Sequence, residues 1–263
     1  MKTGWIFNQQ EGERSMSPVS KDQREGLPNI KAVILDYGQV LVRCPTVREF
    51  ERMAGMFNVP FASFHKLWEG SRDIYDRGDV TAEEYWLQLA ARTNSTLIPE
   101  QIETLRQVEI EIWCHTDPEM LDWLSRMHAA GIKTALLSNM PLDLMRYVLA
   151  NFRWMEKFDF RTFSADVRLI KPDPAIFEHT LRGLGVAASE AVFVDDREPN
   201  IKAADALGIH GILFRSVAQL KDDLKAMGFP VLPVVAERAR ISDRAGAASA
   251  PVERPGEEVK FQL

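Results

Sequence analysis

The chain has 263 residues, of which 46% are hydrophobic and 27% are charged. This composition is close to that of average globular proteins and excludes a wholly disordered, collagen-like or disulfide-rich chain. The formal net charge is −6 at pH 7, and the absence of a dense run of Lys and Arg argues against nucleic acid as a partner. No apolar run approaches the roughly 18 residues of a transmembrane helix, and the N-terminus lacks the apolar stretch of a signal peptide. We therefore expect a cytoplasmic protein that acts on small molecules and has no membrane partner.

The two cysteines, Cys44 and Cys114, have no neighbours at metal-ligand spacing. Such sparse use of cysteine is typical of a reducing compartment, and we expect both thiols to be structural or inert. The two ends of the sequence are poor in large apolar residues and show no strand or helix periodicity. We expect residues 1–28 and 236–263 to be disordered extensions of a folded region.

Short apolar runs and capped helices alternate along much of the folded region. The runs are too short for buried helices and are followed by polar residues, so they predict parallel strands at 32–35, 134–137, 191–194 and 210–214. Three segments have a proline in the first turn of a possible helix, together with a capping residue before it or a glycine after its last turn. They predict helices at 118–130, 174–184 and 199–207. This alternation predicts an α/β fold with a Rossmann-like parallel sheet flanked by helices.

One segment, residues 44–116, breaks the alternation. It contains no convincing strand, and its tryptophans and leucines recur at helical spacing. Thr81 and Glu84 form the sequence pattern of a capping box. We therefore predict a helical cap over 44–116, inserted after the first strand of a core that comprises 29–43 and 117–235, and we expect Trp68, Trp86 and Trp113 to pack inside this cap.

Polar residues follow the predicted strands at the points where ligands bind to open α/β sheets. Each of them alone is typical of a turn or a helix cap. Together, at one edge of one sheet, they indicate a functional site, and they are Asp36, Ser138 with Asn139, Lys171, and Asp195 with Asp196.

These residue types suit one chemistry. A carboxylate can attack a phosphoryl group and form an aspartyl-phosphate, but it must first approach an anion. Mg²⁺ held by carboxylates and a Lys ammonium would offset that repulsion, while a Ser hydroxyl and backbone N–H groups bind phosphate oxygens.

Four segments, VILDYGQVL, TALLSNM, RLIKPDPAIF and AVFVDDREPNIKAADALGI, resemble the four motifs of the haloacid dehalogenase-like (HAD) hydrolase superfamily. They occur in the family's order, and the helical insert resembles the small cap of its phosphatase branch (subfamily IA, like the sugar-1-phosphate phosphatases). The resemblance implies a Rossmann-like core, a Mg²⁺ cofactor and hydrolysis of a small phosphorylated metabolite.

The resemblance also implies roles around the metal. Asp36 would be both the nucleophile and a Mg²⁺ ligand, and the backbone carbonyl of Gly38 would be a second ligand. Asp196 would bind Mg²⁺ directly. Asp195 and Asn200 would support the metal site from its outer shell.

Three residues are implied at the phosphate itself. Ser138 would hold a phosphate oxygen, with the side chain or backbone of Asn139 nearby. Lys171 would stabilise both the nucleophile and the charge of the phosphate. Catalysis would therefore depend on Asp36, Lys171 and Ser138.

Two residues depart from the family's pattern. Gly38 occupies the place of a second Asp that usually serves as acid and base, whose loss typically costs about 10²- to 10⁴-fold in rate. An enzyme without this acid should favour leaving groups that need little protonation, such as that of a sugar-1-phosphate, an acyl phosphate or an aryl phosphate. Arg197 replaces the Ser that usually follows the Asp pair, and it could contact Asp195 or a bound anion.

Two alternatives remain open on the sequence. A 2-haloacid dehalogenase uses the same aspartyl attack on carbon, and Tyr37 with Gly38 superficially resembles its motif. It works without a metal, which would leave the carboxylate cluster uncompensated. A binding or regulatory relative would keep the phosphate site and lack turnover because of Gly38.

The cap carries candidates for substrate specificity. Arg43, Arg72 and Arg77 lie in or beside the insert and could meet a second anion on the substrate, although a solvated helix face explains them equally well. The five histidines show no metal-ligand spacing, and we expect packing or surface roles for them. A monomer and a homodimer are both compatible with the sequence.

Overall fold

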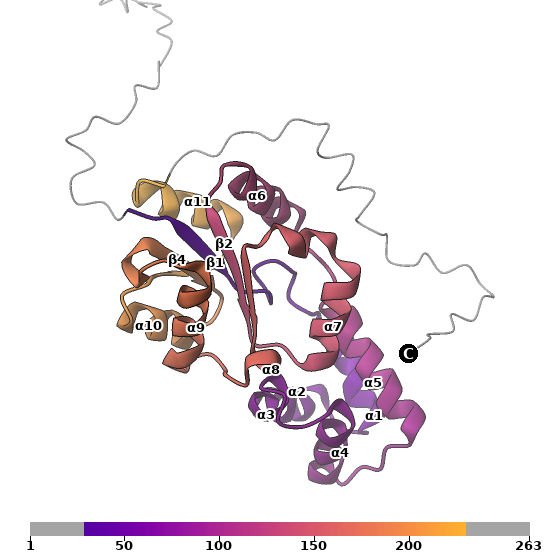
Figure 1. Cartoon of the computed structure of the whole chain (residues 1–263). Helices are drawn as coiled ribbons and strands as arrows, with labels where there is room; N and C mark the ends of the chain where they lie inside the picture. The colour runs from indigo at the N-terminus through magenta and orange to yellow at the C-terminus, as the bar shows by residue number, and fades with distance from the viewer. Residues whose placement is uncertain (1–28, 230–263) are drawn as a thin grey trace, which may run out of the picture.

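The computed structural model describes residues 29–229 (Figure 1). The predicted disordered segments 1–28 and 236–263 lie outside the described residues. Five parallel strands form one sheet in the order β3-β2-β1-β4-β5. Their bounds are β1 Ala32–Leu35, β2 Lys133–Ser138, β3 Phe160–Phe163, β4 Ala191–Asp195 and β5 His210–Leu213. The prediction of a Rossmann-like parallel sheet is therefore confirmed.

The third strand is the one that the sequence analysis missed. Strand β3 has the sequence FRTF, in which only the last two residues are buried. Arg161 is exposed, and Thr162 shares a hydrogen bond of 2.9 Å with the Thr180 hydroxyl. An edge strand that pairs on one side needs no continuous apolar run, so its sequence lacks the signal of a buried strand.

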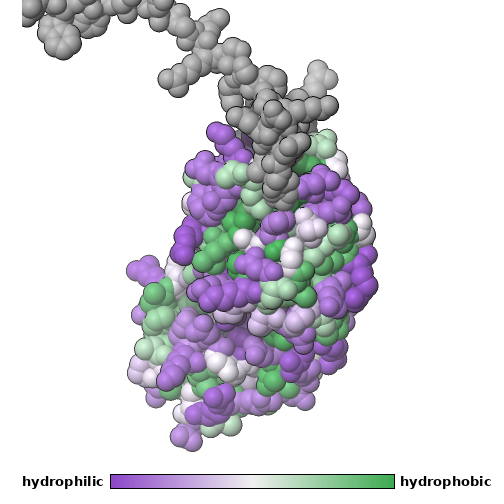
Figure 2. Space-filling model, turned by 90° about the vertical axis from the view of Figure 1, so that its left-hand side faces the viewer, coloured by the Kyte–Doolittle hydropathy of each residue, from purple (hydrophilic) through white to green (hydrophobic). Residues whose placement is uncertain are grey.

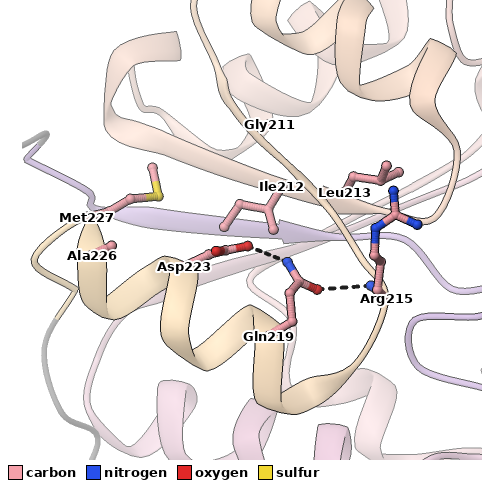
Figure 3. A pocket seen from close by; sticks show the side chains of 8 residues that line it. All are labelled: Gly211, Ile212, Leu213, Arg215, Gln219, Asp223, Ala226 and Met227. Atoms are coloured by element: carbon pink, nitrogen blue, oxygen red, sulfur yellow. Dashed lines mark hydrogen bonds between the residues drawn. The ribbon is translucent and has the colours of Figure 1, made fainter.

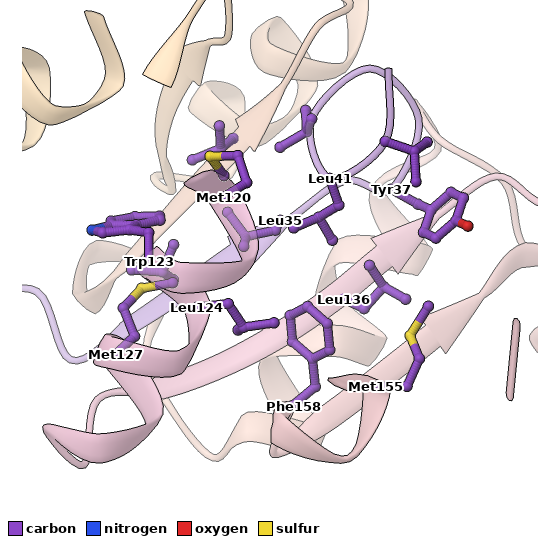
Figure 4. Close-up of a cluster of buried hydrophobic side chains, with 14 of the residues drawn as sticks. Leu35, Tyr37, Leu41, Met120, Trp123, Leu124, Met127, Leu136, Met155 and Phe158 are labelled. Carbon is purple, nitrogen blue, oxygen red and sulfur yellow. The ribbon is translucent and has the colours of Figure 1, made fainter. Parts of the chain in front are cut away.

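Helices cover both faces of the sheet because successive strand residues point to opposite sides. Helices α6 (Pro118–Ala129), α7 (Leu142–Asn151) and α11 (Val217–Ala226) cover one face. On that face Met120, Trp123 and Leu124 of α6 pack near Leu35 and Leu136 (Figure 4). Helices α9 (Pro174–Leu184) and α10 (Glu198–Ala206) cover the other face.

Local capping explains where several of these helices begin. The Asp117 carboxylate accepts hydrogen bonds from the backbone N–H groups of Glu119 and Met120, and Asp173 accepts one from Ala175. These N-caps explain why α6 and α9 begin at Pro118 and Pro174, where the sequence predicts helix starts. Helix α10 begins one residue earlier than predicted, at Glu198, and ends at Ala206. The short elements between the main ones are α8 Ser164–Val167, η2 Arg153–Lys157 and η3 Ala188–Glu190.

The helical insert between β1 and β2 forms a separate layer at the lower end of the sheet in Figure 1. Its helices are α1 Val47–Met56, α2 Phe61–Glu69, α3 Arg72–Asp76, α4 Ala82–Thr93 and α5 Pro99–Ile112. They share their own hydrophobic cluster, which contains Trp68, Tyr85 and Trp86. The predicted capping box of Thr81 and Glu84 begins α4.

Polar contacts hold this cap against the core. Arg106 of α5 forms an ion pair of 2.8 Å with Asp143 of α7. The Ser164 hydroxyl donates to the backbone carbonyl of Asp76, and the same hydroxyl accepts a 2.8 Å hydrogen bond from the Met140 N–H. The cap therefore contacts the loop that follows β2 through one buried serine.

Hydrophilic and hydrophobic residues are mixed on the face of the molecule that Figure 2 shows. Among residues 29–229, no helix has both the length and the apolar composition to cross a bilayer.

Candidate active site

A cavity of about 430 Å³ is lined by residues from the carboxyl ends of the strands and by residues from the cap. The strand ends contribute Asp36, Ser138 and Asp196, and Lys171 enters from the loop before α9. Strand register explains this gathering, because Leu35 pairs with both Leu136 and Val194. Asp36 is therefore level with Leu137 and Asp195, and Ser138 and Asp196 follow one residue further along their strands.

Lys171 is the centre of the charged network. Its ammonium lies 2.8 Å from an Asp36 carboxylate oxygen, 2.7 Å from Asp195 and 3.0 Å from the Leu137 carbonyl. Only 4% of the residue is exposed. Burial alone would lower the pKa of Lys171, but the two carboxylates raise it above its usual value. The three donors of the ammonium thus have three acceptors, and the group stays charged.

Asp195 has no exposed surface, and protein donors occupy both of its oxygens. The Asn200 amide lies 3.0 Å from each oxygen, and the Arg197 N–H donates to one of them at 2.8 Å. The second oxygen accepts from Lys171. This arrangement favours the predicted supporting role of Asp195 and Asn200 over direct ligation of a metal by Asp195.

Asp36 and Asp196 carry the remaining carboxylates. Burial raises the pKa of Asp36 to about 7 against the opposing effect of Lys171, and burial together with Asp195 raises the pKa of Asp196 to about 6. Ligand oxygens of Asp36, Asp195 and Asp196 all lie within 4.8 Å of one another. Hard carboxylate oxygens in such a cluster fit Mg²⁺, which is bound in proteins through one or two carboxylates.

Ser138 and Asn139 lie in the same cavity but differ in their contacts. Among residues 29–229, the Ser138 hydroxyl has no hydrogen-bond partner, so it is available to a ligand. The Asn139 side chain instead binds the backbone of Lys171, with its amide donating to the carbonyl at 3.0 Å and its oxygen accepting from the N–H at 2.9 Å. A contact between Asn139 and phosphate therefore depends on the Asn139 backbone.

Several cavity residues were missed or assigned other roles by the sequence analysis. Trp68 and Trp113 line the cavity as well as packing in the cap, and His65 lies beside them. The acidic residues Glu69, Asp73 and Asp76 also line it. Helical spacing shows that a face is buried but not what it is buried against, so the sequence held no signal for these contacts.

Gly38 leaves room beside the nucleophile. A Cβ at this position would lie 3.4 Å from Cζ3 and 3.7 Å from Cη2 of Trp113, which is ordinary contact, and the backbone of Gly38 is outside the left-handed region. The Tyr37 hydroxyl donates to the Trp113 carbonyl at 2.7 Å and fixes that residue. The Trp113 ring therefore lies next to the position where the family's second Asp would begin.

A second hollow of about 530 Å³ lies between β5 and α11 (Figure 3). Its polar groups bond to one another, because Gln219 accepts from the Arg215 N–H at 3.0 Å and donates to Asp223. It is lined by none of the residues predicted from the strand ends. The cavity around Asp36 is therefore the candidate active site.

Comparisons with known proteins identify the family of the chain. A model of haloacid dehalogenase-like hydrolases matches residues 24–208. The chain belongs to this family. This hydrolase is similar to the sesquiterpene phosphatase of Aspergillus oryzae, with 26% identity over 185 residues that make up 69% of this chain and 88% of that protein.

One further sequence relative and one solved structure are also similar to the chain. Acyl-CoA dehydrogenase family member 10 of Mus musculus is 29% identical over 225 residues, which are 76% of the hydrolase but 19% of that relative. A HAD family enzyme of Bacteroides thetaiotaomicron has a TM-score of 0.60 at 22% identity, over 73% of this chain and 98% of that chain. The same enzyme has been solved with magnesium and inorganic phosphate. These matches show the shared fold.

Proposed function

We propose that this hydrolase is a Mg²⁺-dependent phosphomonoesterase that acts on a small phosphorylated metabolite of the cytoplasm through an aspartyl-phosphate. The observation that carries the proposal is the contact of Asp36 with Lys171 beside Asp196, at the end of a cavity that the cap covers. A nucleophilic carboxylate, a fixed positive charge and a pair of metal-ligating carboxylates are the groups that phosphoryl transfer requires.

Each residue has a definite part in the proposed reaction. An oxygen of Asp36 forms a bond to phosphorus while the bond from phosphorus to the leaving oxygen breaks, and that oxygen departs with the electron pair and takes a proton from solvent. Water then hydrolyses the aspartyl-phosphate, which releases inorganic phosphate and restores the carboxylate. The Ser138 hydroxyl donates to a phosphate oxygen, and the Lys171 ammonium, which already has three acceptors, contributes a fixed positive charge beside the phosphate. Asp36, Asp196 and the Gly38 carbonyl would hold Mg²⁺, with Asp195 and Asn200 behind them. Bound Mg²⁺ supplies the charge that lets a carboxylate approach a phosphate.

The same fold also serves aspartyl attack on carbon, so the fold does not decide between a phosphatase and a 2-haloacid dehalogenase. The carboxylate cluster favours the phosphatase. Asp36, Asp195 and Asp196 lie together, and Lys171 is the ammonium that pairs with two of them. A divalent cation would balance this excess of negative charge and keep Asp36 ionised as a nucleophile.

The experiment that tests this proposal is an assay of phosphate release from p-nitrophenyl phosphate and glucose-1-phosphate, first with Mg²⁺ and then with EDTA. Release over many turnovers that stops in EDTA is the expected result. Binding of phosphate without turnover would instead support the non-catalytic relative, and chloride release from 2-chloropropionate would support the dehalogenase.

The missing acid at Gly38 leads to a prediction on leaving groups. We expect Gly38→Asp to raise kcat/KM for the primary-alcohol ester glucose-6-phosphate by about 10²-fold or more, since a positioned acid contributes about 10²- to 10⁴-fold, and to change glucose-1-phosphate less. The available space beside Trp113 permits the added Cβ. Gly38→Asn is the matched control, because it adds the same bulk without an acidic proton. Equal gains in both variants would contradict the prediction.

The raised pKa values of the metal-binding carboxylates predict a pH dependence of Mg²⁺ binding. Asp36 has a pKa of about 7 and Asp196 a pKa of about 6 without metal, so both take up protons as the pH falls through this range. Mg²⁺ must displace these protons. We expect the Mg²⁺ dissociation constant, measured by calorimetry, to increase about tenfold from pH 7 to pH 6, with protons released on binding. A constant affinity over this range would refute the proposed ligands.

A further inference from the structure

Apolar side chains from the cap and from the core line part of the cavity. The cap contributes the rings of Phe50, Trp68 and Trp113, and the core contributes Met140 and Leu144. A substrate whose phosphate lies against Lys171 would place its leaving group among these side chains. These apolar side chains suit a hydrophobic or aromatic body.

The arginines that were candidates for binding a second anion are already engaged. Both terminal nitrogens of Arg43 bind Glu49, and Arg77 pairs with Asp79. Neither of these arginines lines the cavity. The sequence-based expectation that they could meet an anion in the cavity therefore finds no support in the structure.

Arg72 does line the cavity, but two carboxylates hold it. Its guanidinium lies 2.6 Å from Asp76 and also pairs with Glu109, while its side chain is 12% exposed. The guanidinium lies 4.8 Å from the centre of the Trp68 ring and 4.9 Å from that of Tyr75. Moving Arg72 towards a ligand would leave two buried carboxylates unpaired, which is strongly unfavourable.

Carboxylates outnumber cations at this end of the cavity. Glu69, Asp73 and Asp76 all line it, and among the described residues Glu69 and Asp73 form no ion pair. Arg197 also lines the cavity, and it forms no ion pair with any of residues 29–229. It lies near enough to lower the pKa of Asp76, against the dominant effect of burial. The acidic residues Glu69, Asp73 and Asp76 therefore outnumber Arg72 and Arg197, and the net charge at this end of the cavity is negative.

We propose that the leaving-group half of the cavity selects an apolar group that carries a positive charge or none, and that it rejects a second anion. Glu69 and Asp73 are the specificity-determining residues, because they line the cavity and form no ion pair with any of residues 29–229. Like charges placed opposite each other in such a site lower the affinity for the ligand. The inference rests on the proposed function, since binding of the phosphate at Lys171 sets the orientation of the substrate.

The test uses benzylphosphonates, which cannot be hydrolysed and therefore report binding alone. Three compounds differ only in the para substituent: aminomethyl, hydrogen or carboxyl. Calorimetry on the full chain with Mg²⁺ should give the tightest binding for the aminomethyl compound and a dissociation constant at least about tenfold larger for the carboxyl compound. Equal or tighter binding of the carboxyl compound would overturn the proposal.

Variants then locate the selectivity. The double variant Glu69→Gln with Asp73→Asn should reduce the difference between the charged compounds to about threefold or less. Glu51→Gln with Glu83→Gln is the matched control, because both residues are exposed on the cap and neither lines the cavity. An unchanged difference in the first variant would remove Glu69 and Asp73 from the proposed role.

A separate assay distinguishes this inference from the proposed function. Phosphate release from phenyl phosphate measures catalysis, whereas the phosphonates measure charge preference. Retention of the charge order without any phosphate release would refute the phosphatase and leave the preference standing. Phosphate release with the reverse charge order would refute the preference and leave the phosphatase standing.

Discussion

Replacing Asp36 with Asn is expected to lower kcat for phosphate release by at least about 10⁴-fold, because the amide cannot attack phosphorus and removal of a nucleophile has effects of this size. The substitution keeps the shape of the side chain. It also removes a buried carboxylate whose pKa burial raises to about 7. The unfolding temperature in EDTA should therefore stay within a few degrees of the wild-type value.

Asp173→Asn is a suitable control for this experiment. Asp173 is exposed and caps α9 through a hydrogen bond to the Ala175 N–H, which an Asn can also accept. We expect its activity to remain close to that of the wild type. Near wild-type activity in the Asp36 variant, with a normal unfolding temperature, would exclude Asp36 as the nucleophile.

The second large effect is expected for Lys171→Met, in both stability and activity. The substitution removes the ammonium that lies between Asp36 and Asp195 and leaves these two buried carboxylates facing each other. Breaking a buried ion pair in this way typically costs about 3–5 kcal/mol. Denaturant unfolding at pH 8, above the pKa of about 7 of Asp36, should show this loss. Phosphate release should also fall, by about 10²-fold or more.

A second substitution separates the loss of stability from the loss of activity. Combining Lys171→Met with Asp195→Asn removes one of the unpaired carboxylates, so it should recover part of the lost stability without restoring activity. The two positions are in contact and are expected to be non-additive. Additive losses of stability would show that the buried network does not depend on the charge of Lys171.

The fold could be predicted largely from the sequence because most of its strands are buried on both faces. Strands β1 and β4 have no exposed residue, and a continuous apolar run is a strong signal for such a strand. Strand β3 was missed because an edge strand can carry Arg161 without cost. The helix starts that were predicted correctly depend on Asp117 and Asp173, whose capping contacts are local in sequence.

Some residues of the candidate site could also be predicted from the sequence, and others could not. Residues that follow a strand are placed by the sheet, so Asp36, Ser138 and Asp196 could be expected to meet. The roles of the cap residues depend on contacts between distant segments. Arg72 pairs with Glu109 across two helices, and no local pattern of the sequence indicates that this cation is already neutralised. The charge preference of the cavity therefore required the structure.

The most direct test of the proposed phosphatase mechanism is to trap the aspartyl-phosphate itself. The full chain is mixed with Mg²⁺ and ³²P-labelled phenyl phosphate, quenched in acid during the first turnover and digested for mass spectrometry. The proposed mechanism predicts a phosphoryl group on the peptide that contains Asp36, and none in the Asp36→Asn variant. Rapid release of phosphate with no labelled Asp36 at any quench time, or with the label on another residue, would contradict it.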